Sequence, residues 1–504
     1  MESLPIPVSL ERELKSDTPI PARPMPWGRR FLGYPLSTWL LICLALGVAL
    51  RGWHFLRNDP MWHDEAALVV NVLEKSYADI WGPRKFNETG PPLFLWTEKA
   101  AVAAIGDSTY ALRLIPLLAG IAALFVCVRA LRPIATPVEL LVFALMFGIS
   151  DRLLWHCTEA KMYSTDALVA ALLLLFFVRR EKTVPDFAEG LILAAASSLM
   201  FFSFPVVFVL PAYGIARLPT LWRSRKAGAW VGMVLFGGVF FGCFALLAVG
   251  PVAAIRTADL DFGWSYIFPD WQRWWTVPHE LLRRTWEAFR YTLEPVGHVL
   301  MPFAVWGGIA LKRRGHGPLA AFLWLTIGFN IIAWLAGKYP LGPTRVNTFL
   351  APACLTLIAV GVGDLFERVF VRLGPWAWLV PLPILAAIIL AVASLILPWR
   401  RLQMDGPAEL VLSQRTSKEP VVAWFWEHHY YFREIGDWRR DTPPKIDDPE
   451  LEGVWYLHHT TAKPHHLQDP FWPDLVFRTS KDWTSEVTRF RDYDVWHFRR
   501  KPKE

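Results

Sequence analysis

The sequence predicts an α-helical membrane protein with many spans and a small α/β domain at its C-terminal end. Hydrophobic residues make up 54% of the 504 residues, whereas soluble domains contain about 45–50% apolar residues. Many of them stand in long apolar runs of about 20 residues, the length that crosses a bilayer as a helix. Residues 399–504 lack such runs. They carry short β-prone segments at 419–425, 453–457, 487–491 and 494–498.

These runs divide the chain into a tail at 1–34, a transmembrane domain at 35–398 and a C-terminal domain at 399–504. The tail is polar and proline-rich, which predicts a disordered segment rather than a cleaved signal peptide. We expect about eleven spans, because 187–217 is long enough for two short ones that break near Ser203-Phe204-Pro205. The spans are predicted at about 36–55, 111–129, 137–156, 164–178, 187–217 (two), 229–252, 297–311, 318–336, 347–363 and 376–398.

Clusters of Lys and Arg define the orientation of these spans. They fall on one side of the membrane and lie at 29–30, 129–132, 179–182, 217–226 and 312–314. Since Lys and Arg favour the cytoplasmic side, the N-terminus is predicted to be cytoplasmic. The C-terminal domain is then periplasmic or otherwise extracytoplasmic, in a multi-pass protein of the cell (inner) membrane. The clusters bracket apolar runs instead of forming one basic stripe, so the net charge of +7 indicates no nucleic-acid partner.

The first outer loop, at about 56–110, carries the most informative polar residues. Residues 62–74 place their apolar side chains on one helical face, which predicts an interfacial helix. Asp64 and Glu65 lie in its first turn, where acids either complement the helix dipole or belong to an active site. Pro91-Pro92 predicts the start of another helix.

The second outer loop, at about 253–296, is rich in tryptophan. Residues 281–293 predict another interfacial helix. Tryptophans near lipid headgroups are typical of membrane anchors. The alternative is a mobile segment that closes over a binding site.

Cysteine and histidine spacing predicts no disulfide, metal site or cofactor. The five cysteines form no CxxC pair and lie in or beside apolar runs, as buried thiols do. The C-terminal domain contains the pairs His428-His429, His458-His459 and His465-His466. Adjacent residues of a strand point to opposite faces, so surface histidines or acceptor contacts are favoured over a bound metal.

Five motifs in the first part of the chain resemble those of a known family. They are Leu50-Arg51, Trp62-His63-Asp64-Glu65-Ala66, Gly90-Pro91-Pro92-Leu93, Ala111-Leu112-Arg113-Leu114-Ile115-Pro116 and Glu159-Ala160-Lys161-Met162-Tyr163. Their order and spacing resemble the N-terminal half of the GT-C glycosyltransferases. The nearest groups are the protein O-mannosyltransferases, the lipid A aminoarabinose transferases and the lipopolysaccharide-core sugar transferases. The resemblance covers about 35–180 and fades toward the C-terminal domain. It implies a GT-C fold with interfacial helices in the first outer loop.

Two positions depart from the family pattern. Gly90 stands where the family often has His, Lys or Gln, and Lys161 stands where it usually has Arg. A lysine keeps the charge but loses the planar fork that binds phosphate bidentately. Both departures affect the expected contacts to the donor phosphate more than the fold.

The resemblance implies a chemistry and a set of residues. Enzymes of this family use a polyprenyl-phosphate-linked sugar and invert the anomeric centre, and Asp64 matches the carboxylate that takes the proton from the acceptor hydroxyl. Glu65 either tunes Asp64 or is only a helix-start acid. The candidate cations for the donor phosphate are Lys85, Lys161 and Arg345, and the candidate substrate contacts are Glu159, Tyr163 and Tyr339.

Each of these roles has a simpler alternative. Arg345 and Lys85 also fit interfacial cations that reach toward the headgroups, and Glu159 also fits a structural ion pair. The leading hypothesis is a hexosyl- or pentosyltransferase in a lipid membrane that acts on a glycan, lipid or protein acceptor. The competing hypotheses are a non-catalytic GT-C-like scaffold and a lipid or sugar transporter. A transporter predicts polar groups within the spans and internal symmetry, and neither is evident in the sequence.

Overall fold

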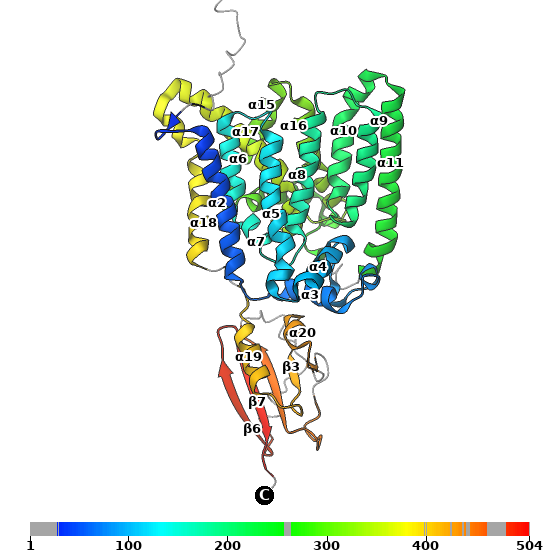
Figure 1. The fold of residues 1–504 in the computed structure, drawn as a ribbon, viewed down its shortest axis with the longest axis vertical. Coiled ribbons are helices and arrows are strands. Elements are labelled where there is room, and N and C mark those ends of the chain that lie inside the picture. Colours follow the sequence, from blue (N-terminus) through cyan, green and yellow to red (C-terminus); the bar gives the residue numbers. More distant parts are fainter. Residues whose placement is uncertain are drawn as a thin grey trace, which may run out of the picture.

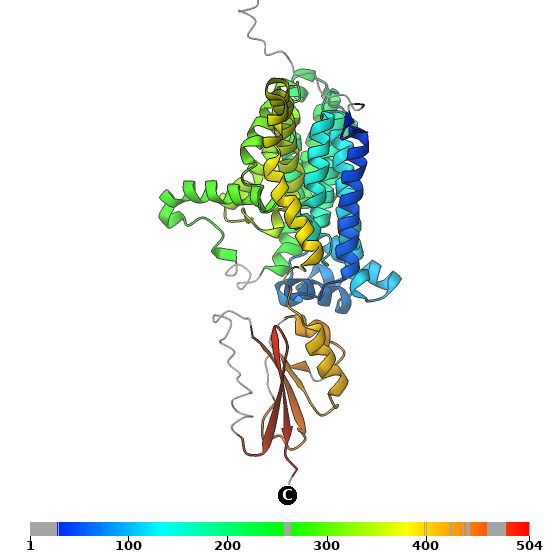
Figure 2. The same cartoon turned by 90° about the vertical axis from the view of Figure 1, so that its left-hand side faces the viewer.

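The computed structural model describes residues 28, 30–256, 264–397, 399, 401–423, 426–435, 438–439, 444–460 and 480–502. Most of the predicted tail at 1–34 and the pair His465-His466 lie outside these residues. Figure 1 shows a bundle of long helices with a smaller sheet domain at one end, and Figure 2 shows the same arrangement from a second direction.

The bundle contains helices of ten or more residues in every range where a span is predicted. They are α2 (Leu36–Arg57), α5 (Thr109–Leu131), α6 (Pro137–Ile149), α8 (Tyr163–Arg180), α9 (Phe187–Ala196), α10 (Val206–Ser224), α11 (Ala227–Leu247), α15 (Met301–Arg313), α16 (Gly317–Leu335), α17 (Ala351–Leu373) and α18 (Leu382–Ile396). Short helices extend or join them. These are α7 (Asp151–His156), η3 (Ser197–Phe201), η4 (Ala248–Val252), α12 (Ala253–Ile255), η6 (Arg345–Leu350) and η7 (Gly374–Leu379).

The number of membrane spans stays a prediction. Among the described residues, five helices are long and apolar enough to cross a bilayer by length and composition alone. The helix predicted at 137–156 is interrupted at Ser150, whose hydroxyl accepts a hydrogen bond from the Leu153 amide and caps α7. The break predicted within 187–217 is present between η3, which ends at Phe201, and α10, which begins at Val206.

Glycine allows the closest approach between helices of the bundle. A Cβ atom built on Gly361 of α17 would lie 1.8 Å from the Phe303 carbonyl oxygen of α15, and one on Gly307 would lie 2.0 Å from the Leu357 carbonyl oxygen. Small residues of this kind bring helix backbones together in membranes, where the lipid supplies no hydrophobic drive for association. This contact sets the position of α17 against α15, and therefore also the position of the short helix η6, which directly precedes α17.

The first outer loop folds into α3 (His63–Glu74), η1 (Asp79–Trp81), η2 (Lys85–Asn87) and α4 (Pro92–Ile105). These elements lie at the end of the bundle that faces the sheet domain (Figure 1). The predicted helix of the first loop and the start at Pro92 are therefore confirmed. In the second outer loop, η5 (Trp271–Thr276) precedes α14 (Val277–Thr292), so α14 begins four residues before the predicted start.

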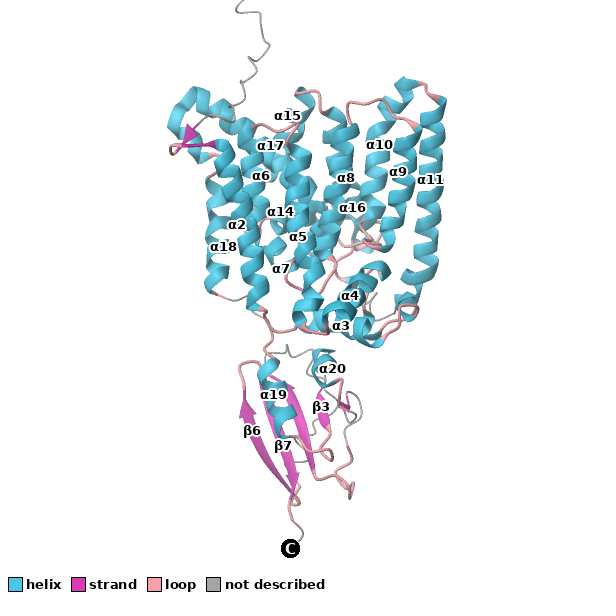
Figure 3. Cartoon of the chain, viewed as in Figure 1, coloured by secondary structure: helices cyan, strands magenta, loops and turns pink. Residues whose placement is uncertain are grey.

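The C-terminal domain forms a sheet with helices beside it (Figure 3), and its described residues make a mixed five-stranded sheet and two helices. The sheet order is β4 (Trp438–Arg439), β3 (Val421–Ala423), β5 (Gly453–His459), β7 (Tyr493–Arg500) and β6 (Trp483–Arg489). The helices are α19 (Asp405–Gln414) and α20 (Trp426–Phe432). The strand predicted at 487–491 has shifted bounds, because β6 spans Trp483–Arg489, where it pairs antiparallel with β7.

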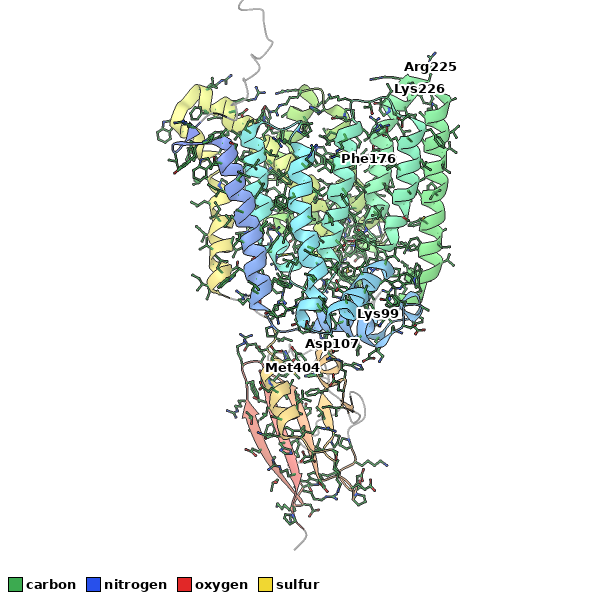
Figure 4. The ribbon with its side chains drawn as sticks, in the orientation of Figure 1. Lys99, Asp107, Phe176, Arg225, Lys226 and Met404 are labelled. Atoms are coloured by element: carbon green, nitrogen blue, oxygen red, sulfur yellow. The ribbon has the colours of Figure 1, made fainter. Side chains whose placement is uncertain are left out.

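Residues labelled in Figure 4 locate the two ends of the bundle. Arg225 and Lys226 lie at the end far from the sheet domain, whereas Lys99, Asp107 and Met404 lie at or beside the junction with it (Figure 4). A two-stranded ribbon of β1 (Arg30–Phe31) and β2 (Tyr34–Pro35) precedes α2. The first outer loop contacts the sheet domain at this junction, where Glu74 of α3 pairs with His429 of α20.

Candidate active site

Asp64 and Arg345 form an ion pair although they are far apart in the sequence. Asp64 lies in the first turn of α3, and Arg345 begins η6. An Arg345 Nη1 atom contacts Asp64 Oδ2, and the side chains keep 29% and 19% of their exposed surface, for Arg345 and Asp64 respectively. The pair is therefore within reach of a ligand, unlike the buried acids Glu65, Glu88 and Glu159.

Aromatic rings hold the Arg345 guanidinium in place. Its Cζ lies 5.2 Å from the ring centre of Trp62 and 6.0 Å from that of Tyr163. Cations favour such positions over aromatic faces. Tyr339 supports the same segment, because its hydroxyl donates a hydrogen bond of 2.9 Å to the Val346 carbonyl oxygen. The structure thus brings four predicted residues together: Asp64, Tyr163, Tyr339 and Arg345.

Glu65 points away from this exposed pair into the protein. It is fully buried, and Arg113 of α5 binds both carboxylate oxygens, at 2.6 Å from Nε and 2.8 Å from Nη2. The Ala160 amide donates a third hydrogen bond, of 2.8 Å, to Glu65 Oε1. Arg113 also donates to Asn58 Oδ1. Glu65 therefore joins three of the sequence motifs, namely those that contain Glu65, Arg113 and Ala160.

Glu159 is the second buried acid of the candidate site, and both of its carboxylate oxygens have partners. Its Oε2 accepts hydrogen bonds from the indole nitrogens of Trp62, at 3.0 Å, and Trp155, at 2.9 Å. Its Oε1 lies 2.6 Å from His156 Nδ1. Burial alone would raise the pKa of Glu159, but the contact with His156 and the nearby guanidinium groups lower it to about 2. Glu159 is thus ionised. It accepts a hydrogen bond from Trp62, whose ring lies beside the Arg345 guanidinium.

His156 connects this cluster to the second outer loop. Its Nε2 lies 2.6 Å from the Tyr291 hydroxyl of α14. A neutral imidazole satisfies both contacts, because Nδ1–H donates to Glu159 while Nε2 accepts from Tyr291. Neither His156 nor Arg113 was assigned a role from the sequence. Arg113 lies inside one of the motifs, and His156 stands three residues before Glu159, the helical spacing at which side chains meet.

Lys161 is held by an acid rather than left free for a phosphate. Its Nζ lies 2.5 Å from Glu88 Oε2, and both side chains are buried. Glu88 Oε1 also accepts a hydrogen bond from the Gly90 amide. A Cβ atom at Gly90 would lie 2.7 Å from Leu95 Cδ1 and 3.1 Å from Glu88 Oε1, which explains the glycine at this position.

Lys85 lies in a separate cluster between the first outer loop and the sheet domain. Its Nζ contacts one Glu74 oxygen, and the other Glu74 oxygen lies 2.6 Å from His429 Nε2 of α20. Burial opposes the ionisation of Glu74, but the contacts with Lys85 and His429 lower its pKa overall. The structure therefore groups Lys85 with Glu74 and His429, and Lys161 with Glu88.

The arrangement offers a partly exposed carboxylate for proton uptake and a guanidinium for an anion. Arginine presents five N–H donors and forms strong contacts with phosphate oxygens. Within the described ranges, no group of three or more His, Cys, Asp or Glu residues is placed to hold a metal ion.

Comparisons with known proteins agree with this fold. None of the protein-family models and none of the curated proteins matches the sequence. Among solved structures, ArnT from Cupriavidus metallidurans bound to undecaprenyl phosphate superposes with a TM-score of 0.52 at 13% identity, over 92% of this chain and 98% of that chain. Archaeal oligosaccharyltransferase AglB from Archaeoglobus fulgidus, with an inhibitory peptide and a dolichol-phosphate, gives a TM-score of 0.47 at 12% identity, over 83% of this chain and 69% of that chain. The similarity to ArnT shows that the chain has the fold of the GT-C membrane glycosyltransferases, as the sequence motifs predicted.

Proposed function

We propose, from the GT-C fold as premise, that the chain is an inverting glycosyltransferase that uses a polyprenyl-phosphate-linked sugar. The observation that carries the proposal is the partly exposed ion pair of Asp64 and Arg345 beside two aromatic rings. This pair would supply a base next to a binding group for an anion. The bound undecaprenyl phosphate of ArnT, which shares the fold, supports a lipid phosphate as the donor group.

In this proposal, Asp64 acts as the general base. Its carboxylate takes the proton from the acceptor hydroxyl while the hydroxyl oxygen forms a bond to the anomeric carbon. The bond between that carbon and the phosphate oxygen breaks, and its electron pair leaves with the polyprenyl phosphate. Attack from the face opposite the leaving group inverts the anomeric centre.

Arg345 would bind the phosphate of the donor and its growing negative charge. In the structure the Arg345 guanidinium contacts Asp64. A donor phosphate that binds Arg345 would replace this contact and leave the Asp64 carboxylate available for the acceptor proton. Donor binding would then precede base catalysis. Tyr163 and Tyr339 would position Arg345, while Glu65 and Glu159 would hold the α3 segment that carries Asp64.

The proposal includes the topology and the substrate classes. About eleven spans at 35–398 would place the N-terminal tail at 1–34 in the cytoplasm and the domain at 399–504 outside the inner membrane. The acceptor would be a glycan, lipid or protein hydroxyl, and the transferred group a hexose or pentose. A reporter fused after Pro398 tests this topology, because a cytoplasmic reporter would contradict it.

The decisive experiment compares Asp64→Asn with a matched acid of the same outer loop. Asp79 is exposed and accepts a hydrogen bond of 2.6 Å from the Ser76 hydroxyl, so Asp79→Asn controls for the loss of one carboxylate. We expect Asp64→Asn to lower transfer by about 10²–10⁴-fold, the usual contribution of a general base, and Asp79→Asn to leave it unchanged. The measurement is mass spectrometry of envelope glycans and lipids from cells that carry each variant or lack the gene.

A second measurement separates the base from the phosphate site. Binding of undecaprenyl phosphate to the purified protein should weaken in Arg345→Gln and persist in Asp64→Asn. A correctly inserted Asp64→Asn protein with unchanged glycosylation would refute the catalytic role and favour the scaffold hypothesis.

A further inference from the structure

Helix α20 joins the sheet domain to the first outer loop. It lies between β3 and β4, which pair in parallel, and parallel strands are usually connected by such a crossover helix. It packs against α3, the helix that carries Asp64. Figure 1 shows α20 at the end of the sheet domain that faces the first outer loop. The helix is therefore a contact between two parts of the chain that are far apart in the sequence.

The two faces of α20 belong to different hydrophobic clusters. His428 and Phe432 stand four residues apart and share one face. Both are fully buried, and Phe432 packs with residues of β3, β5 and β7. Tyr430 lies two residues from each, about 200° around the helix, and it is only 7% exposed. Its cluster is that of the first outer loop, with Met61, Ala66, Val69 and Val70.

Two polar contacts flank the buried Tyr430 ring. His429 Nε2 lies 2.6 Å from Glu74 Oε1 in the last turn of α3. Arg433 Nη2 lies 2.9 Å from Oδ2 of Asp107, which stands between α4 and α5. The His429 ring also meets that of Phe86 in η2, with 5.2 Å between the ring centres. The sheet domain therefore contacts three parts of the first outer loop: α3, η2 and the connection from α4 to α5.

Helix α3 is anchored to a different domain at each end. Its first turn is anchored to the bundle, because Glu65 pairs with Arg113 of α5. Its last turn is anchored to the sheet domain through Glu74. A helix of 12 residues is about 18 Å long, so the two anchors are well separated. With one anchor a short helix can pivot, whereas two anchors fix its direction and the position of its first-turn residue Asp64.

We propose that the sheet domain is a clamp for α3, and that Tyr430 and His429 of α20 are positioning residues for Asp64. When α20 leaves the first outer loop, α3 keeps the anchor at Glu65 and loses the anchor at Glu74. The Asp64 carboxylate then no longer has a fixed place beside the reacting atoms, which slows the chemical step. The part that concerns catalysis rests on the proposed function, whereas the clamp concerns the fold alone.

The first test measures amide hydrogen exchange of the full chain in detergent. Tyr430→Ala removes the ring that α20 buries in the first outer loop, so we expect exchange in α3 to become faster by about tenfold or more. Tyr430→Phe keeps the ring and should exchange as wild type does. Tyr266→Ala is the matched control, because Tyr266 is 76% exposed in the second outer loop, and it should leave α3 unchanged. Unchanged exchange of α3 in Tyr430→Ala would overturn the clamp.

A covalent link separates undocking of α20 from damage to the sheet domain itself. Glu74→Cys with His429→Cys places two thiols at the contact between α3 and α20. A short bifunctional thiol reagent then joins the two helices in the Tyr430→Ala background, and mass spectrometry identifies the joined peptides. Slow exchange of α3 should return in the cross-linked protein, even if the strands of the sheet still exchange fast. Exchange of α3 that stays fast after cross-linking would refute the clamp.

The second test measures sugar transfer by mass spectrometry of envelope glycans and lipids, normalised to the amount of inserted protein. We expect Tyr430→Ala to lower transfer by about 10- to 100-fold, and Tyr430→Phe and Tyr266→Ala to transfer as wild type does. Purified Tyr430→Ala should still bind undecaprenyl phosphate, because Arg345 stands on η6 and not on α3.

The outcomes of the two tests distinguish the clamp from the proposed function. Normal transfer by Tyr430→Ala despite fast exchange in α3 would refute the role of α20 in positioning Asp64, and so would a loss of undecaprenyl phosphate binding. If wild type and Asp64→Asn transfer equally little, the proposed function fails, while hydrogen exchange still decides the clamp.

Discussion

Replacement of Arg113 by glutamine tests how strongly the buried ion pair holds the candidate site. Arg113 makes two charge-assisted hydrogen bonds to Glu65 and others to Asn58 Oδ1 and the Asp59 carbonyl. Both charged side chains are essentially buried, so the variant leaves Glu65 with the Ala160 amide, at 2.8 Å, and the Arg401 guanidinium, at 3.5 Å. Breaking a buried pair costs about 3–5 kcal/mol, and the lower end of this range applies because Arg401 still offsets part of the charge of Glu65. We expect a loss of that size in the free energy of unfolding, measured by SDS titration in mixed micelles.

Two controls define what would refute this reasoning. Arg283 pairs with Glu280 and Glu287 on the exposed face of α14, so Arg283→Gln should cost less than about 1 kcal/mol. Removing both charges in Glu65→Gln with Arg113→Gln should recover about 1–3 kcal/mol of the loss. If Arg113→Gln costs no more than Arg283→Gln, the pair does not stabilise the site.

Three further predictions follow from the packing and the charges. Gly361→Ala should separate α15 from α17 and cost about 2 kcal/mol or more, whereas Gly237→Ala, with no heavy atom within 4 Å of the added Cβ, should be neutral in the same SDS titration. Gly90→Ala should cost about 1–3 kcal/mol, because its Cβ meets Leu95 and Glu88. The low pKa of Glu159, about 2, means that its ionised form stabilises the fold above the unfolded pKa of about 4.3 and that this stability is lost as the pH falls toward 2. Glu159→Gln should therefore reduce the drop in melting temperature between pH 6 and pH 3.

Much of the fold could be predicted because it depends on local patterns. Apolar runs located the helices of the bundle, and the 62–74 pattern located α3, since both depend on residues near in sequence. The break at Ser150 was missed because Ser150 lies inside an apolar run, and only its capping hydrogen bond reveals it. The bounds of β6 were missed for a similar reason, since this strand begins and ends where β7 pairs with it.

Side-chain pairing in the site could not be predicted from the sequence. Lys85, Lys161 and Arg345 carry the same charge, and nothing local distinguishes them, but packing gives them Glu74, Glu88 and Asp64 as partners. Arg401 follows an apolar helix and resembles any interfacial cation. Its position behind Trp155 depends on how the sheet domain meets the bundle.

The pairing of Asp64 with Arg345 also has a consequence for how the protein is made. Asp64 leaves the ribosome about 280 residues before Arg345, which at about 5–20 residues per second corresponds to about 15–60 s. During that interval α3 is inserted without the cation that pairs with Asp64, and Arg401 arrives later still. A chain interrupted before η6 therefore contains the carboxylate without its partner, and the site is assembled only when synthesis of the bundle is almost complete.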